Sequence, residues 1–195
     1  MNPATDQPTI SAVTPDWSRE AKVWWAWDPP RSLLASIRSY QRHRGSRNPL
    51  RLLASKLAVL RHRFWGIVTG ADIPLNSQIG GGLRIPHPNG IVIHPSAHIG
   101  VNCLVFQQVT IGMRGEDGVP WIGGHVDIGA GAKVLGQVRL GDHARVGANA
   151  VVLDDVPEGA MAVGIPARVI GANAGIGQPA KLKRVAERER RSGTH

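Results

Sequence analysis

Residues 122–156 read IGGHVDIGAGAKVLGQVRLGDHARVGANAVVLDDV, and an aliphatic residue returns there at every sixth position. The same spacing holds upstream, apart from a two-residue slip after Ile91 and a longer interruption after Ile111. Glycine often follows the aliphatic residue directly, and a small or β-branched residue usually stands four places after it. The aliphatic positions are Ile73, Ile79, Ile85, Ile91, Ile93, Ile99, Val105, Ile111, Ile122, Ile128, Val134, Leu140, Val146 and Val152.

A period of six fits neither an amphipathic helix nor an alternating strand. It is typical of a solenoid in which three short straight segments and three turns close one triangular coil. Each aliphatic side chain then points inward and stacks on its counterpart in the next coil, and glycine suits a corner where a Cβ is hindered or φ is positive. The repeat therefore predicts a mainly β fold, a parallel β-helix over residues 71–170, whose core residues contribute about 1.5–3 kcal/mol each.

Composition places limits on the class of protein. The chain has 195 residues and a single cysteine, Cys103, which is expected to fill a small inward position. One cysteine permits no disulfide within the chain, which agrees with a reducing compartment. The N-terminus shows no signal peptide and no stretch that could span a membrane, so a cytoplasmic protein is expected.

The net charge of +9 is carried mainly by the regions that flank the repeat. This charge favours an anionic partner, such as a nucleotide cofactor, an acidic glycan or a membrane surface. No nucleic-acid partner is expected, because the few aromatic residues are not interleaved with basic ones.

Residues 1–70 are predicted to form a tail and a short helical segment ahead of the β-helix. Residues 1–16 are polar and are expected to be loose. The next stretch holds four tryptophans, which should pack on another element or another subunit; they are Trp17, Trp24, Trp25 and Trp27. Asp28-Pro29-Pro30 is expected to break any helix, and residues 31–42 are predicted to form one afterwards.

A second helix is predicted from Pro49, with Asn48 as its cap, to about Val68. Its apolar residues follow 3/4 spacing, and arginine and lysine occupy much of the rest; the apolar set is Leu50, Leu53, Leu57, Leu60, Phe64 and Ile67. A basic amphipathic helix can make peripheral contact with a membrane. Packing on the first coil or on a neighbouring subunit is the favoured interpretation. Residues 171–195 are expected to be a basic C-terminal tail, either a short helix or disordered.

The repeat is interrupted by MRGEDGVPW, residues 113–121. Ile122 follows Ile111 by eleven positions instead of six, so about five residues must leave the coil as a loop. Solenoids usually place such an interruption on the working face.

Several runs within residues 79–171 resemble the hexapeptide-repeat acyltransferases, and among these the serine acetyltransferases. The runs are GLRIPHPNGIVI, VTIGMRG, IGAGAKVLGQVRLG, VGANAVVLDDVP and VGIPARVIG. The resemblance implies a left-handed β-helix, a homotrimer with active sites between neighbouring coils, and acetyl-CoA as the acyl donor. No metal is required.

The resemblance also implies roles for individual residues. His87 in IPHPNG would be the general base, since a neutral imidazole is suited to take the proton of a hydroxyl that attacks a thioester. Ala130 and Ala148 along the coil and Arg168 after it match positions that bind coenzyme A. Arg114 in the loop would hold the phosphates of the cofactor or an acidic sugar.

Three departures from the serine acetyltransferase pattern favour another acceptor. Pro86 stands where the family has aspartate, Val119 stands where it has a second histidine, and Arg47-Asn48-Pro49 is the nearest match to an Arg-Asp-Pro stretch that helps bind serine. The chain is similar instead to polysaccharide O-acetyltransferases of the colanic-acid type. A sugar hydroxyl of an exopolysaccharide, a capsule or its precursor is therefore the expected acceptor, with Trp121 stacking on the ring and Asn89 also in the acceptor site.

Two alternatives remain at this point. The chain could be a serine O-acetyltransferase of cysteine biosynthesis, in which case serine alone would be turned over. It could also be a non-catalytic β-helix scaffold, in which case no thioester turnover would be observed.

Overall fold

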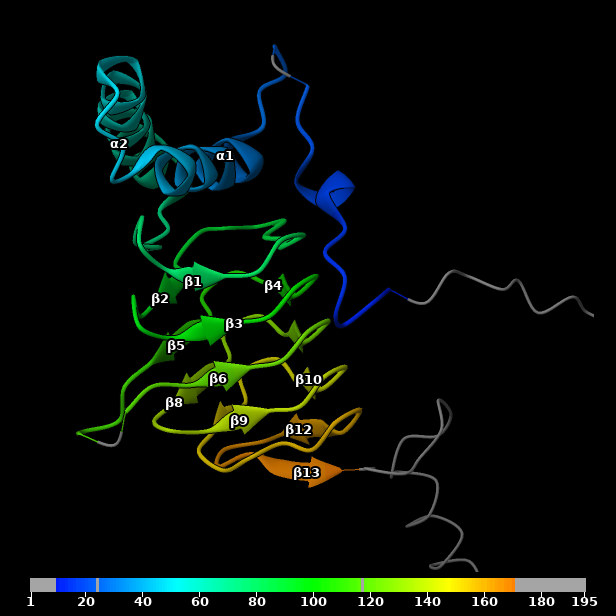
Figure 1. Ribbon diagram of the computed structural model, residues 1–195. Coiled ribbons are helices and arrows are strands. Elements are labelled where there is room, and N and C mark those ends of the chain that lie inside the picture. Colours follow the sequence, from blue (N-terminus) through cyan, green and yellow to red (C-terminus); the bar gives the residue numbers. More distant parts are fainter. Residues whose placement is uncertain (1–9, 24, 117, 171–195) are drawn as a thin grey trace, which may run out of the picture.

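The computed structural model (Figure 1) describes residues 10–23, 25–116 and 118–170. The chain forms a triangular prism of stacked coils, with two helices over the end where the coils begin. Followed away from the helices, the coils turn in the left-handed sense, so the predicted left-handed parallel β-helix is confirmed. The predictions for the basic tail and for Trp24 lie outside the described residues.

Three sheets of short strands form the sides of the prism, and each is named here after its first strand. The β1 face holds β1 (Gln78–Ile79), β3 (His98–Ile99), β6 (Trp121–Ile122) and β9 (Arg139–Leu140). The β2 face holds β2 (Val92–Ile93), β5 (Thr110–Gly112), β8 (Lys133–Leu135) and β11 (Val151–Val152). The β4 face holds β4 (Leu104–Val105), β7 (Asp127–Ile128), β10 (Arg145–Val146), β12 (Met161–Val163) and β13 (Arg168–Ile170).

The interior of the prism is filled by the aliphatic repeat. Ile79, Ile99, Ile122 and Leu140 pair in register along the β1 face and form one inward column. These four residues and the other aliphatic repeat positions are all buried, and Cys103 is buried with them. The core predicted from the six-residue period is therefore confirmed.

The glycines that follow the aliphatic residues allow neighbouring coils to approach closely. A Cβ built on Gly80 would come within 2.7 Å of the Gly100 backbone, so any larger residue would push the coils apart. Several corner residues with positive φ are not glycine. They are Asn102, Gln108, His125, His143 and Asn149.

Both predicted helices are present at the N-terminal end of the prism. Helix α1 (Pro29–His43) is capped by Asp28, and its two prolines form the first turn, where a missing N–H is harmless. Its buried apolar residues cover the first coil. Helix α2 (Pro49–Thr69) is capped by Asn48, as predicted, and ends at Gly70, whose φ is +64°.

The apolar stripe of α2 is not packed on the first coil. Its residues Leu50, Leu53, Leu57, Leu60, Phe64 and Ile67 are all exposed, while Ala58 on another side of the helix is buried. Contact of this stripe with a neighbouring subunit or a membrane surface stays a prediction. Within the described ranges, neither helix combines the length and hydrophobicity that crossing a bilayer requires.

Residues 10–20 form an ordered N-terminal strap along one edge of the prism, where the sequence predicted a loose segment (Figure 1). Asn102 is fully buried beneath it, and its side chain donates to the carbonyls of Ser11 and Thr14 and accepts from the N–H of Asp16. The strap is ordered because a buried amide needs these partners. The strap includes the 3₁₀-helix η1 (Trp17–Glu20).

The far end of the prism is closed by a reversal of the chain. Strand β13 pairs with β12 in the antiparallel direction, unlike the parallel pairs of the coils. Between β5 and β6 the chain leaves the coil as a projecting loop, as the eleven-residue spacing predicted (Figure 1).

Candidate active site

The predicted base, His87, lies on the edge of the prism between the β4 and β2 faces, which we call the His87 edge. Its side chain is exposed. Backbone hydrogen bonds stack the turns of successive coils along this edge: Gln108 N donates to Asn89 O at 2.9 Å, and Asn149 N donates to Ala130 O at 2.8 Å. The edge therefore runs continuously from the turn of His87 to the distal coils.

Four of the predicted site residues share the His87 edge, namely His87, Asn89, Ala130 and Ala148. Ala130 is half-buried and Ala148 is exposed. Since alanine side chains are small, they leave backbone groups accessible to an extended ligand. The edge thus offers a path that leads toward the imidazole.

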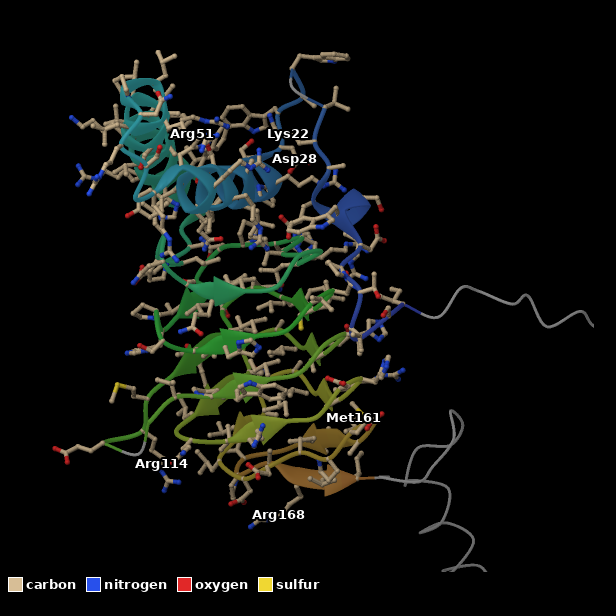
Figure 2. All side chains as sticks on the ribbon, viewed as in Figure 1. Lys22, Asp28, Arg51, Arg114, Met161 and Arg168 are labelled. Atoms are coloured by element: carbon tan, nitrogen blue, oxygen red, sulfur yellow. The ribbon has the colours of Figure 1, made fainter. Side chains whose placement is uncertain are left out.

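Arg168 lies at the far end of the prism, on β13 (Figure 2). Its guanidinium Nη1 is 3.8 Å from Asp154 Oδ2, and both side chains are largely exposed. An ion pair of this kind contributes little to stability, so Arg168 is available to bind another anion.

Arg114 and Trp121 lie away from the His87 edge within one chain. Arg114 belongs to the projecting loop (Figure 2), and its Cβ approaches Gly136. Trp121 stands on the β1 face, where the His98 ring stacks on it at 5.3 Å with an 11° interplanar angle. The Arg139 guanidinium lies 4.8 Å from the indole centroid, on the opposite neighbouring strand. A sugar ring would therefore have to displace a neighbour to stack on Trp121.

A cavity of about 230 Å³ adjoins Pro86, directly before His87. It lies between the first coil, the start of α1 and the N-terminal strap. Its lining residues are Arg19, Asp28, Pro30, Arg31, Leu34, Leu83, Arg84, Ile85 and Pro86. The strap and α1 thus add charged groups beside the His87 turn.

Asp28 is a residue that the sequence reasoning did not assign to the site. Figure 2 shows it at the start of α1, where its Oδ1 accepts from the N–H of Arg31 at 3.1 Å. Its Oδ2 lies 3.2 Å from Arg31 Nη1, and its side chain is 25% exposed. Ligand can therefore reach this carboxylate.

Asn48, in the nearest match to the Arg-Asp-Pro stretch, lies far from the cavity beside Pro86. Asn48 caps the outer end of α2, about 30 Å by the helical rise from the end beside the coil. Asp28, which precedes Pro29 in the sequence, lines this cavity instead. The signal was present in the sequence, but it was interpreted only as a helix break.

No family model matches the chain. Curated relatives do match it. The serine acetyltransferase of Mycobacterium tuberculosis is 44% identical over 124 residues, 62% of this chain and 52% of the relative. That of Synechococcus elongatus is 38% identical over 107 residues, 53% of this chain and 44% of the relative. The chain thus spans about half the length of these curated relatives.

Solved structures extend the comparison. A serine acetyltransferase in complex with CoA is 32% identical, with a TM-score of 0.61 over 74% of this chain and 58% of that one. The soybean serine acetyltransferase complexed with serine is 33% identical, with a TM-score of 0.55 over 73% of this chain and 70% of that one. The resemblance to colanic-acid-type enzymes gains no support from these relatives, which favour the serine alternative.

Proposed function

Because the chain belongs to the serine acetyltransferase family of hexapeptide-repeat acyltransferases, we propose that it transfers an acetyl group from acetyl-CoA to a hydroxyl, with L-serine as the acceptor. The observation that carries this proposal is the cavity beside Pro86, which holds an accessible carboxylate, Asp28, next to the turn of His87. An amino-acid acceptor needs such a partner, since an ammonium desolvated without one is costly.

In the proposed reaction His87 acts as general base. The imidazole takes the proton of the acceptor hydroxyl while its oxygen attacks the carbonyl carbon of the thioester. The tetrahedral oxyanion is stabilised by N–H donors near the turn. The C–S bond then breaks, the imidazolium returns the proton to the leaving thiolate, and the products are an acetyl ester and free CoA. No covalent acyl-enzyme is needed.

Acetyl-CoA would lie along the His87 edge. Ala130 and Ala148 leave room there for the pantetheine arm, and the amides of the stacked turns supply polar partners. Arg168 at the distal end would meet the negative charge of the nucleotide portion. The CoA complex of a relative supports this choice of donor.

A homotrimer is part of the proposal. Arg114 and Trp121 are remote from His87 within one chain, so they could join the site only from a neighbouring subunit. The same assembly offers a partner for the exposed stripe of α2.

A sugar acceptor is the second candidate, favoured by one observation. Pro86 and Val119 carry no charge where the family pattern has an aspartate and a histidine, so fewer groups are available to orient the base and hold a zwitterion. A neutral hydroxyl acceptor needs neither charge.

The test is an assay of CoA release by the purified protein with acetyl-CoA and either L-serine or free and lipid-linked sugars. Turnover of L-serine that exceeds background hydrolysis, with O-acetylserine identified by mass spectrometry, is the expected result. Turnover of a sugar with no serine activity would replace the acceptor, and no turnover with any acceptor would favour the scaffold alternative.

A further inference from the structure

The cavity beside Pro86 carries more positive than negative charge. Three guanidinium groups line it, those of Arg19, Arg31 and Arg84, with one carboxylate, that of Asp28. Arg31 and Asp28 form an ion pair at 3.2 Å. Among the described residues that line the cavity, Arg19 and Arg84 therefore have no carboxylate partner.

Arg19 is the more buried of these two arginines. Its Nε atom is buried and has no hydrogen-bond partner within the described part of the chain. Burial lowers the pKa of the Arg19 guanidinium, and the like charge of Arg84 lowers it further, against smaller opposing effects led by Asp16 and Asp127. A buried guanidinium beside a like charge is unfavourable, so an anion in the cavity would offset the repulsion between Arg19 and Arg84.

The N-terminal strap fixes Arg19 in this position. Glu20 accepts from the N–H groups of Gly82 and Leu83 and forms an ion pair with Arg38 at 2.8 Å. Asp16, on the other side of Arg19 in sequence, donates its N–H to Asn102. The backbone of Arg19 is thus held beside the cavity before any ligand arrives, which lowers the entropic cost of binding.

We propose that Arg19 and Arg84 bind an anionic group of the acceptor, a carboxylate or a phosphate, in this cavity. The inference rests on the proposed function, because it assigns the cavity to the acceptor. Guanidinium groups recognise both anions through charge-assisted and often bidentate hydrogen bonds. Asp28 on the same cavity would face the ammonium group of a zwitterion. Arg19 and Arg84 thus determine specificity and take no part in proton transfer.

Binding of inorganic phosphate to the full chain tests the anion site without requiring catalysis. Isothermal titration calorimetry should show saturable binding that weakens at least ten-fold in Arg19→Gln and in Arg84→Gln. Arg19→Lys keeps the charge and should recover part of the loss. Arg145→Gln is the matched control. Arg145 is exposed and stands at the same position of the β4 face as Arg84, three coils further along the prism. This variant should bind phosphate as the unmodified chain does.

The acceptor assay distinguishes the two sources of the anion. L-serine and serinol share the ammonium and a hydroxymethyl group, and only serine has the carboxylate; glucose 1-phosphate and glucose form the corresponding phosphate pair. In one of these two pairs, the anionic compound should have a KM at least ten-fold below that of the compound without the anion. Arg19→Gln should abolish that difference and leave the KM for acetyl-CoA unchanged.

Two outcomes of the phosphate titration would overturn the inference: binding that survives both glutamine variants, or an equal loss in Arg145→Gln. Equal KM values for the compounds with and without the anion in both pairs would also overturn the inference, while the proposed function would stand. Phosphate binding that depends on Arg19 in a chain without any acetyl transfer would retain the anion site and reject the proposed function.

Discussion

The Nδ1 atoms of His125 and His143 lie 2.8 Å apart on neighbouring coils, with both residues in the left-handed region of φ. One ring must donate to the other, so at least one of these nitrogens is unprotonated. Burial lowers the pKa of His125, and the charges of His143 and two arginines add to this, while Asp127 opposes it. Burial also lowers the pKa of His62.

These lowered pKa values predict a loss of stability in acid. The unfolded chain binds protons on these histidines near pH 6.5, whereas the folded chain binds them only at lower pH. Stability should therefore be complete above about pH 6.5 and fall as the pH drops toward the folded-state values. Urea unfolding between pH 7.5 and pH 5 measures this dependence of stability on pH. His125→Asn should flatten this dependence, because asparagine tolerates the positive φ at this position and carries no titratable group. Gln108→Asn, which changes a residue with positive φ on another edge, is the control and should leave the dependence unchanged. An unchanged slope in His125→Asn would contradict this account.

Asn102→Ala should release the N-terminal strap. The change removes three hydrogen bonds, to Ser11, Thr14 and Asp16, at about 1 kcal/mol each, and it leaves their partners to water. Asn149→Ala is the control, because Asn149 has nearly the same φ but an exposed side chain. We expect Asn102→Ala to lower the free energy of unfolding by roughly 1–3 kcal/mol more than the control. Faster proteolysis at the strap should accompany the loss, and equal stability of the two variants would refute it.

Cys103 should be unreactive in the folded chain. Burial raises the pKa of its thiol to about 12, and its Sγ donates to the Gly123 carbonyl at 3.2 Å. The thiolate is the nucleophilic form, so Ellman's reagent at pH 8 should label the protein only after denaturant is added. Labelling of the native protein at the rate of a free thiol would show that this coil opens readily.

His87→Ala should lower kcat/KM by about 10²–10⁴ without changing the thermal midpoint, because a general base contributes that factor and the side chain is exposed. His94→Ala is the matched control at a different corner, where the ring Nδ1 of His94 accepts a local hydrogen bond from Ser96 N. Release of CoA, followed as free thiol, measures both variants. Comparable activity in the two alanine variants would remove His87 from the mechanism.

The features that repeat could be predicted from the sequence, and the features that join distant segments could not. Each coil places its inward residue against the same position of the next coil, so a six-residue period was sufficient to identify the core from Ile73 to Val152. Both helices carried caps and apolar spacing of their own. The β1-face ladder of His98, Trp121 and Arg139 follows from the same period once the loop is allowed for.

The cavity beside Pro86 required the fold. Its charged residues come from the strap, the start of α1 and the first coil, and no periodic signal links Arg19 or Asp28 to Arg84. Likewise, Asn102 stands in the repeat as an ordinary corner residue, and only the structure shows that a strap almost ninety residues earlier in the chain satisfies its amide.

The reversal at β13 has a consequence for how the protein behaves at high concentration. A stack of parallel coils exposes unpaired strand edges, onto which a second molecule could add end to end and begin a fibre. Here α1 lies across the first coil. At the other end, β13 is the last strand of the β4 face and runs antiparallel to its neighbour β12. Since neither end of the stack continues the coil within the described residues, the prism should remain a discrete particle and resist polymerisation along its axis.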